Sequence, residues 1–345
     1  MSNPLLDKID MAELLIQMGF SDVNPRAQKY LGYCLFHQDT LTKSFSADFG
    51  KKVYFCFGCS IKGNAIDLFA RWRNITYQQA CQELETLPNF RSLNALDMKL
   101  ATEKEMPAYR KLEIMTTLIE RCRPIGANGL LDDAYNYMLG RGISHQTLSD
   151  FGIRIAPTPA DWIGLISSGM PVADLEYLGI DYDQFMRYPI LFPYWFCGRV
   201  TWIQGRCMGE PPSKKQSKYN NVSIGLTYAY NHDVLLTETD TVYICEGAMD
   251  VLSMYELGHR SVIGLPGVNN FHANWLQDFR CKKVVLALDN DRAGQEGALK
   301  LSKLFLERGI IVERFPLAAE FKDVNCYLQQ AKLLDRAGYR VVLGK

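Results

Sequence analysis

The sequence predicts a multidomain α/β protein of three units, and three observations support this fold class. Two pairs of Cys and His residues enclose a short aromatic hairpin near residues 34–59, which predicts a small zinc-ribbon-like α+β domain. A basic stretch of short strands and turns over 188–230 predicts a mixed α+β subdomain. Strands and helices alternate over 241–315, which predicts an α/β domain with a parallel sheet.

The composition is that of a folded chain with more than one hydrophobic core. Of the 345 residues, 48% are hydrophobic and 22% are charged, which excludes a disordered or fibrous protein. The 38 basic and 38 acidic side chains cancel, so binding of nucleic acid would require a local basic patch. The sequence shows no apolar run long enough to span a membrane and no signal peptide, which predicts a cytoplasmic protein without membrane contact.

The first predicted domain covers residues 1–90. Apolar residues spaced by three and four predict an amphipathic helix over Leu5–Met18. Aromatic-rich runs predict two hairpin strands and helical periodicity predicts two later helices: Phe45–Asp48, Val53–Phe57, Ala65–Trp72 and Tyr77–Leu84. Residues 91–127 are a predicted linker, because most of them lack a strand pattern and mix charges with scattered Leu and Met; their end, 107–122, has helical periodicity.

Four residues of the first domain have the spacing of zinc ligands. Cys34 and His37 form one pair, and Cys56 and Cys59 form a second pair after eighteen intervening residues. The hairpin between them can bring both pairs around one tetrahedral ion, and three thiolates with one imidazole favour zinc. We therefore expect one structural Zn²⁺. The seven other cysteines stand singly in apolar surroundings and are expected to be buried thiols.

The hairpin also carries lysines beside aromatic residues: Lys43, Lys51, Lys52, Phe45, Tyr54 and Phe57. This pattern suits a surface that stacks bases and contacts phosphates of single-stranded nucleic acid. It suits equally a hairpin with an aromatic core and a solvated basic edge. Composition alone does not separate the two interpretations.

The second predicted domain, 128–236, carries the local basic patch. Helices are predicted over Leu130–Leu139 and Ser144–Phe151. Between Arg187 and His232 the sequence has a single acid, Glu210. Six basic residues belong to this window: Arg187, Arg199, Arg206, Lys214, Lys215 and Lys218. The imbalance predicts a surface that contacts phosphate groups.

The third predicted domain covers 237–330, and a short tail, 331–345, follows it. Four continuously apolar strands are predicted at Thr241–Cys245, Ser261–Leu265, Lys283–Leu288 and Ile310–Phe315. Helices predicted between them are Ala248–Leu257, His272–Phe279 and Ala293–Arg308. Strands of this kind joined by helices predict a parallel sheet covered on both faces.

Four carboxylates follow two of these strands. Glu246 follows the first strand and precedes the helix that carries Asp250, and Asp289 and Asp291 follow the third strand. The carboxyl ends of parallel strands face one crevice, so these acids are expected to converge. Clustered carboxylates repel one another unless a cation neutralises them, which predicts bound Mg²⁺ or Mn²⁺. Taken singly, each acid could instead be a helix N-cap or a first-turn acid.

The order of these motifs resembles a known family. The Glu-Gly-x-x-Asp element at 246–250 and the Asp-x-Asp-x-Ala-Gly element at 289–294 resemble the Toprim domain. The two ligand pairs, followed by Gly-Asn-Ala-Ile-Asp at 63–67, resemble the zinc-binding domain of bacterial DnaG-type DNA primases. Elements between them follow the order of that family's polymerase amino-terminal subdomain: 141–143, 151–153, 188–190, 198–200, 205–206 and 218–220. The resemblance covers about 5–328.

The resemblance implies a DNA primase, a DNA-directed RNA polymerase that makes short RNA primers on single-stranded DNA by two-metal nucleotidyl transfer. The acids that it implies for catalysis and magnesium binding are Glu246, Asp250, Asp289, Asp291 and Asp323. The basic residues that it implies for template and nucleotide are Arg199, Arg206 and Lys218. Expected partners are the template, ribonucleoside triphosphates and a replicative helicase supplied by a separate chain.

The sequence departs from the family's pattern in three places. Val324 and Asn325 replace a proline and an acid after Lys-Asp, which predicts weaker metal binding there. Leu35 and Lys43 replace prolines usual around the first ligand pair. The chain ends soon after the Toprim motifs, as expected of a compact phage, plasmid or mobile-element primase without the helicase-binding domain.

A second class of function stays open on the sequence. A catalytically silent zinc and Toprim module that binds single-stranded DNA, as a replication or regulatory factor of a mobile element, would carry the same motifs. The intact carboxylates favour the enzyme, whereas the shortened carboxy end favours the silent module. A topoisomerase or Toprim nuclease is less well supported, because those enzymes need further domains.

Overall fold

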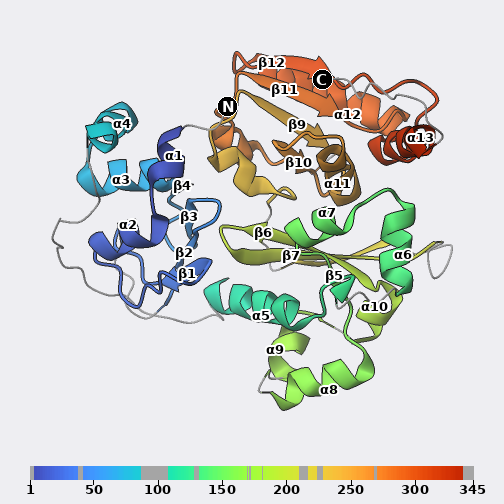
Figure 1. Ribbon diagram of the computed structural model, residues 1–345, viewed down its shortest axis with the longest axis horizontal. Coiled ribbons are helices and arrows are strands. Elements are labelled where there is room, and N and C mark those ends of the chain that lie inside the picture. The colour runs from blue at the N-terminus through green and yellow to red at the C-terminus, as the bar shows by residue number, and fades with distance from the viewer. Residues whose placement is uncertain are drawn as a thin grey trace.

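The computed structural model describes residues 4–37, 42–86, 108–127, 132–168, 170, 172–180, 182–209, 217–223, 228–267 and 270–336. Within these ranges the chain forms three four-stranded sheets. We name three units after them: amino-terminal (4–86), middle (108–223) and carboxy-terminal (228–336). Figure 1 shows the amino-terminal unit in blue at the left, the middle unit in green below the centre and the carboxy-terminal unit in orange at the top. In the described part of the chain, no helix has the length and apolarity needed to cross a bilayer.

The amino-terminal unit packs short helices around an antiparallel sheet of order β1-β2-β3-β4. Its elements are α1 (Pro4–Lys8), α2 (Met11–Gln17), β1 (Lys29–Gly32), β2 (Phe45–Asp48), β3 (Val53–Cys56), β4 (Lys62–Asn64), α3 (Ala65–Arg73) and α4 (Tyr77–Thr86). The predicted single helix over Leu5–Met18 is wrong. Asp10 caps α2 instead, because its carboxylate accepts hydrogen bonds from the backbone N–H groups of Ala12 and Glu13.

The middle unit is built on the antiparallel sheet β5-β6-β7-β8. Its elements are α5 (Ala108–Arg121), α6 (Asp133–Gly140), α7 (His145–Asp150), β5 (Arg154–Ile155), α8 (Pro159–Ser167), α9 (Val172–Tyr177), α10 (Tyr182–Arg187), β6 (Ile190–Phe196), β7 (Arg199–Arg206) and β8 (Tyr219–Ser223). Part of the predicted linker, 91–127, lies outside the described residues. Its later part forms α5, whose buried face, including Met115 and Leu118, packs on β7.

The carboxy-terminal unit has the predicted parallel sheet, in the order β10-β9-β11-β12. Its elements are η2 (His232–Leu236), β9 (Thr241–Cys245), α11 (Ala248–Glu256), β10 (Val262–Gly264), η3 (Ala273–Asp278), β11 (Lys283–Ala287), α12 (Arg292–Leu306), β12 (Ile311–Arg314) and α13 (Val324–Arg336). The helices α11 and α13 share a core with one face of the sheet, and η3 and α12 share a core with the other. The predicted α-helix over His272–Phe279 is instead the short 3₁₀ helix η3, which has no side-chain cap.

The amino-terminal unit packs against the other two units through a seam that is partly apolar. Val53 and Phe55 of β3 form a buried cluster with Phe196, Cys197 and Leu236. Ion pairs flank the cluster, and two of them reach buried carboxylates: Lys51 to Asp233 at 3.0 Å and Lys62 to Asp278 at 2.7 Å. The orientation of the amino-terminal unit is therefore set by packing and not by chain connection alone.

Candidate functional site

The first candidate site is the cluster of the four predicted zinc ligands. Cys34 and His37 follow β1, Cys56 ends β3, and Cys59 lies in the turn before β4. Their ligand atoms all lie within 4.8 Å of one another, with 3.9 Å between the sulfurs of Cys34 and Cys59. Two sulfurs bound about 2.3 Å from one tetrahedral ion are separated by roughly 3.8 Å. The geometry therefore fits a closed structural zinc site.

The surroundings of the cluster hold these ligands in place. The backbone N–H of Cys59 donates to the sulfur of Cys56 at 3.4 Å. A Cβ atom on Gly58 would lie 2.5 Å from Nε2 of His37, so the glycine leaves room for the imidazole. The hydrogen bond with Cys34 lowers the pKa of Cys56 to about 5, and the same bond, with burial, raises the pKa of Cys34. A zinc ion would take the place of the protons that the thiols otherwise share.

Of the three aromatic residues named for the hairpin, Phe45 and Tyr54 belong to the core, and Phe57 is partly buried against Phe55. Phe45 and Tyr54 are fully buried and stack on each other at a centroid distance of 5.4 Å. The ammonium of Lys51 pairs with Asp233, and that of Lys52 donates to the carbonyl of Leu6. The structure thus favours the second interpretation of this hairpin, an aromatic core with a basic edge.

The second candidate site is an acidic cavity at the carboxyl ends of β9 and β11. The pairing of Cys245 with Ala287 places Glu246 and Asp289 just beyond neighbouring strand ends. The cavity has a volume of about 560 Å³. Carboxylates on one side and basic or amide groups on the other line it: Glu246, Asp250, Asp289, Asp323, Arg141, Gln204, Arg206, Lys218, Asn221, Lys322 and Asn325. Four of the five predicted acids therefore meet in one cavity.

The acidic strand ends lead directly into helices, and at Asp289 a glycine makes this close approach possible. Gly247 is the N-cap residue of α11, the helix that carries Asp250. Gly294 lies in the first turn of α12, where a Cβ atom would stand 2.2 Å from the carbonyl oxygen of Asp289. A side chain at position 294 would thus displace the backbone of Asp289.

Glu246 has the electrostatic environment of a cation ligand. Its Oε2 atom is buried and has no hydrogen-bond partner among the described residues. Burial, with the charges of Asp289 and Asp291, raises the pKa of Glu246 to about 7. An unpaired buried carboxylate oxygen facing other carboxylates is a position that a divalent cation would stabilise.

The other acids of the cavity are only partly neutralised within the fold. Burial raises the pKa of Asp289, although Lys322 opposes this through an ion pair of 3.2 Å. Burial and the neighbouring charge of Asp323 raise the pKa of Asp250. The four-ligand cluster is the one group of at least three Cys, His or acidic donors in the described ranges whose atoms lie within 4.8 Å of one another. The carboxylates of the cavity are therefore too far apart to surround an ion by themselves. A magnesium ion there would need water or phosphate oxygens as further ligands.

The basic side of the cavity is built around Arg206. This arginine ends β7 and is only 7% exposed. Its guanidinium donates to the hydroxyl groups of Tyr137, at 2.9 Å from Nη2, and of Tyr219. Within the described structure its guanidinium is held by hydroxyl groups and not by a carboxylate, which leaves its charge for an anion in the cavity. Lys218, which precedes β8, lines the same space.

Two predicted site residues have other surroundings. Arg199 pairs with Phe196 at the start of β7, whereas Arg206 pairs with Ile190, so the two lie roughly 23 Å apart along the strand. Arg199 lies near Glu120 and Glu113 and does not line the cavity. Asp291 is exposed and caps α12, accepting a hydrogen bond from the N–H of Gly294 at 2.9 Å. The predicted basic residues Lys214 and Lys215, and Glu210, lie outside the described residues.

Sequence reasoning assigned no site role to several residues that line the acidic cavity, among them Arg141, Lys322 and Asn325. Arg141 and Lys322 stand inside motifs quoted for the resemblance, so a signal for them was present. Asn325 replaces the family's acid, and its buried amide donates to the carbonyl of Arg141 at 2.9 Å and to Ser253 Oγ at 2.8 Å. It joins α13 to α11 and to the loop after α6.

In comparisons with known protein families, the two segments that carry these sites each match a family model. Residues 1–98 match the family model of the CHC2 zinc finger, and residues 243–328 match a Toprim-like family model. The DNA primase of Clostridium acetobutylicum is 30% identical over 310 residues, which are 83% of this chain and 50% of that protein. The DNA primase of Lactococcus lactis is 26% identical over 336 residues, 91% of this chain and 51% of that protein. This chain thus spans about half the length of the curated relatives it matches.

A solved structure shares the fold. The zinc-binding and RNA polymerase domains of the Aquifex aeolicus primase match with a TM-score of 0.56 at 22% sequence identity. The match covers 96% of this chain and 83% of that one. Together with the two family models, it confirms the predicted fold class of a multidomain α/β protein with a zinc-ribbon domain and a Toprim parallel-sheet domain.

Proposed function

We propose that this chain is a DNA primase, which synthesises short RNA primers on single-stranded DNA as a DNA-directed RNA polymerase. The observation that carries the proposal is the single cavity in which four carboxylates face Arg206 and Lys218. Nucleotidyl transfer needs groups of both signs, because cations must be held beside a polyanionic substrate. The resemblance to bacterial DNA primases over most of this chain supports the same reaction.

The carboxylates of the cavity would hold Mg²⁺ or Mn²⁺. Glu246 and Asp289 are the best placed, because they follow neighbouring strands and Oε2 of Glu246 has no partner within the described structure. Asp250 and Asp323 line the same space. The bound ions would activate the attacking hydroxyl group and stabilise the leaving pyrophosphate. Glu246 must release the proton that its raised pKa retains near neutral pH before it can act as a ligand.

The basic side of the cavity would position the anionic substrates. Arg206 is held by Tyr137 and Tyr219, so its guanidinium loses little freedom when it binds a phosphate. Lys218 would contribute a second charge to the triphosphate or to the template strand. Arg199 would have at most an indirect role, since it lies at the far end of β7.

The amino-terminal unit would carry one structural Zn²⁺ and present the template to the cavity. The four-ligand cluster has no position for a substrate, because Cys34, His37, Cys56 and Cys59 complete a tetrahedron. The expected partners are single-stranded DNA, ribonucleoside triphosphates and a replicative helicase in a separate chain.

Primer synthesis from labelled ribonucleotides on single-stranded DNA circles, with Mg²⁺ and then Mn²⁺, tests the proposal. Glu246→Gln and Asp289→Asn should each lower the rate by about a hundredfold or more, since each removes a cation ligand. Asp240→Asn is the matched control, because this exposed acid precedes the opposite end of β9. Circular dichroism checks folding.

Two outcomes would overturn the proposal. One is that the unmodified protein makes no primers with either metal. The other is that Glu246→Gln and Asp289→Asn keep the unmodified rate. In either case the silent binding module becomes the better assignment, provided that single-stranded DNA still binds.

A further inference from the structure

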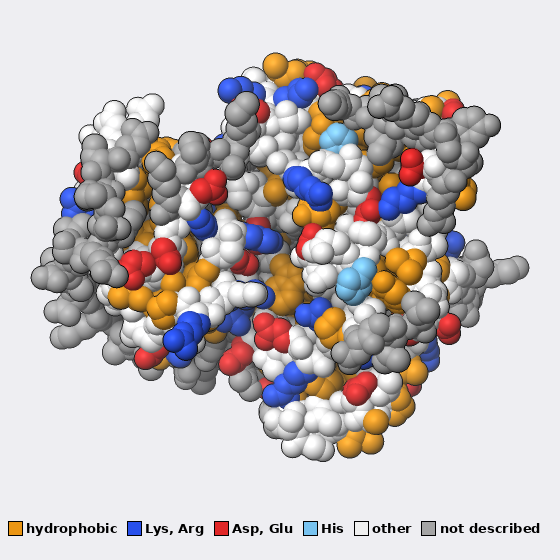
Figure 2. Space-filling model, viewed as in Figure 1, with side chains coloured by type: hydrophobic (Ala, Val, Ile, Leu, Met, Phe, Trp, Pro, Cys, Tyr) orange, Lys and Arg blue, Asp and Glu red, His pale blue; other side chains and the backbone are white. Residues whose placement is uncertain are grey.

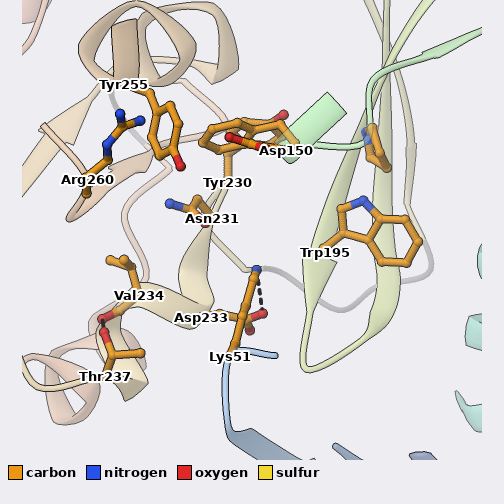
Figure 3. A pocket seen from close by; sticks show the side chains of 12 residues that line it. Lys51, Asp150, Trp195, Tyr230, Asn231, Asp233, Val234, Thr237, Tyr255 and Arg260 are labelled. Atoms are coloured by element: carbon orange, nitrogen blue, oxygen red, sulfur yellow. Dashed lines mark hydrogen bonds and ion pairs between the residues drawn. The ribbon is translucent and has the colours of Figure 1, made fainter. Parts of the chain in front are cut away.

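A second cavity, of about 320 Å³, lies where the three units meet. Figure 3 shows the side chains around it, and Figure 2 shows apolar side chains in a hollow near the middle of one face of the molecule, with charged side chains around it. The amino-terminal unit contributes Lys51, the middle unit contributes residues that include Trp195, and the carboxy-terminal unit contributes Tyr230, Tyr255 and Arg260. None of these residues lines the acidic cavity.

The upper wall of the junction cavity is a set of packed aromatic rings. Phe151 stacks on Tyr230 with a centroid distance of 5.6 Å and an interplanar angle of 15°. Tyr255 meets Phe151 edge to face at 5.0 Å. Trp195 stands across the cavity from this wall (Figure 3), and Gly152 fits against its indole nitrogen. Aromatic rings on facing walls can stack a planar base that has left its neighbours.

The polar groups that line the junction cavity include the carboxylates of Asp150 and Asp233 as well as Lys51, Asn231, Thr237 and Arg260. The guanidinium of Arg260 lies 3.7 Å from the ring centroid of Tyr255, and Arg260 itself is exposed at the rim. Asn231 donates its amide N–H to the carbonyl of Val262 at 2.9 Å, which holds this side chain in position. Lys51 reaches the floor through its ion pair with Asp233. A cation at the rim suits a phosphate outside the cavity, and the fixed amide of Asn231 in its lining suits the polar edge of a base within it.

An aromatic ladder links the junction cavity to the acidic cavity. Tyr230 packs edge to face on Tyr194 at 4.9 Å, and Tyr194 stacks on Trp202 at 5.8 Å. The indole N–H of Trp202 donates to Oδ1 of Asn221 at 3.1 Å, and Asn221 lines the acidic cavity. The two cavities therefore border the same contact between the middle and carboxy-terminal units.

We propose that the junction cavity receives one unstacked base of the single-stranded DNA template. The base would lie between Trp195 and the aromatic wall, and the phosphate that follows it would contact Arg260. The identity of the strand as template rests on the proposed function, whereas the binding of a base does not. The base would come from a strand and not from a free nucleotide, because Arg260 is the one cation among the described lining residues that has no ion pair, and one such charge is too little for a triphosphate.

Photo-cross-linking tests this inference with a short oligothymidylate in which 5-iodouracil replaces single thymines. Cross-linked peptides, identified by mass spectrometry, should contain Trp195 or Tyr255. Tyr255→Leu and Arg260→Gln should each weaken binding of the oligonucleotide by about fivefold or more, since stacking on one aromatic ring contributes at least that much. Arg260→Gln changes an exposed side chain, so it keeps the test valid if Tyr255→Leu fails to fold.

The matched control is Tyr177→Leu. Tyr177 is 54% exposed on α9 and has the ammonium of Lys111 over its ring at 5.4 Å, so it repeats the same pair of groups away from the junction. The Tyr177→Leu protein should bind the oligonucleotide with the same affinity as the unmodified protein. Equal affinities for Arg260→Gln and Tyr177→Leu, or cross-links that lie wholly outside the cavity, would overturn the inference, as would absence of oligonucleotide binding.

Two further arms separate this inference from its alternatives. Free thymidine monophosphate should not displace the cross-link at concentrations comparable with those of the oligonucleotide; displacement would mean a mononucleotide site and would overturn the strand assignment. Glu246→Gln should lose primer synthesis but keep the cross-link. If the unmodified protein makes no primers yet still cross-links at Trp195 or Tyr255, the polymerase proposal fails while the base site stands.

Discussion

Two regions of this molecule contain buried carboxylates, and they differ in whether other side chains neutralise the charge. One region is the seam with the amino-terminal unit and the other is the acidic cavity. At the seam with the amino-terminal unit, Asp233 accepts hydrogen bonds from the N–H of Cys197 at 2.8 Å and from Lys51 at 3.0 Å. Asp278 meets Lys62 at 2.7 Å and Nε2 of His232 at 3.1 Å. Each seam carboxylate therefore has partners from two elements, and its charge is neutralised within the fold.

The acidic cavity leaves its carboxylates short of partners. Oε2 of Glu246 has none among the described residues, and Asp289 has Lys322, whose side chain is 65% exposed. The difference lies in neutralisation and not in burial, since Asp278 and Asp289 are only 4% and 9% exposed. Buried acids with full sets of partners stabilise a contact between units, whereas buried acids without them indicate a place for a cation.

Removal of zinc should lower stability more than any other change proposed here, and it should also break the contacts at the seam. Cys56→Ser or strong chelation should unfold the amino-terminal unit, because a structural zinc site supplies on the order of 10 kcal/mol. Lys51 and Lys62 would then leave Asp233 and Asp278. Hydrogen exchange should rise over 232–236 and 273–278 but not over β11. Unchanged exchange in Cys56→Ser would show that zinc does not hold this unit in place.

Neutralising one acid in each region should give opposite results. Asp278→Asn leaves the ammonium of Lys62 beside a buried amide and should lower the free energy of unfolding by about 3 kcal/mol. Asp289→Asn removes a repelled charge and should leave the free energy of unfolding in the absence of metal unchanged or higher. Urea titration in the presence of a chelator for Mg²⁺ measures both. Equal losses in the two variants would contradict the comparison.

Added Mg²⁺ should raise the stability of the protein through the acidic cavity and not through the seam. At about a hundred times its dissociation constant, the ion should raise the free energy of unfolding by roughly 2.7 kcal/mol. The melting temperature should rise with Mg²⁺ in the unmodified protein and in Lys51→Met. It should stay constant in Glu246→Gln; a rise there equal to that of the unmodified protein would exclude Glu246 as a ligand.

The acidic cavity should also make stability depend on pH. The pKa of Glu246 is raised from 4.5 to about 7, so between these values the folded protein holds a proton that the unfolded chain has released. The free energy of unfolding of the metal-free protein should therefore fall as pH rises from about 4.5 to about 7. Glu246→Gln should flatten this part of the curve. A curve identical to that of the unmodified protein would contradict the assignment.

The smallest effect is expected at the rim of the seam. Lys51→Met should change the free energy of unfolding by less than about 1 kcal/mol, because the lysine side chain is 41% exposed. Asp233 keeps its bond from Cys197. A double-mutant cycle with Asp233→Asn measures the pair itself, and a coupling above about 3 kcal/mol would place Lys51 among the fully buried pairs.

Patterns that repeat along the chain predicted the fold well. Apolar runs marked β9, β10 and β11, and the predicted parallel pairing of these strands with β12 is confirmed. The prediction that all four strands are continuously apolar is wrong for β12, an edge strand that carries Glu313 and Arg314 and is mostly exposed. The helices α8, α9 and α10, which are six to nine residues long, were not predicted, although the equally short α7 was. Short helices depend on caps and tertiary contacts more than on periodicity.

Local spacing predicted the candidate sites in part. The four zinc ligands lie in one hairpin, so the distances between them follow from the chain itself. Glu246 and Asp289 were predicted because strand ends of a parallel sheet meet. Arg199 and Arg206 look alike in the sequence, but the ends of β7 have different neighbours. The pair of Lys62 with Asp278 joins residues 216 positions apart, and no local pattern predicts such a contact.

The close approach of Gly294 to the carbonyl of Asp289 links two positions that perform different tasks. Residue 294 carries no functional group, yet even an alanine there would displace the backbone of Asp289, the proposed cation ligand. In a library of random variants, position 294 should therefore be as intolerant as position 289 when survival depends on the acidic cavity. Substitutions at positions 289 and 294 are therefore expected to occur together. In a relative without the carboxylate at position 289, a larger residue at position 294 would be tolerated.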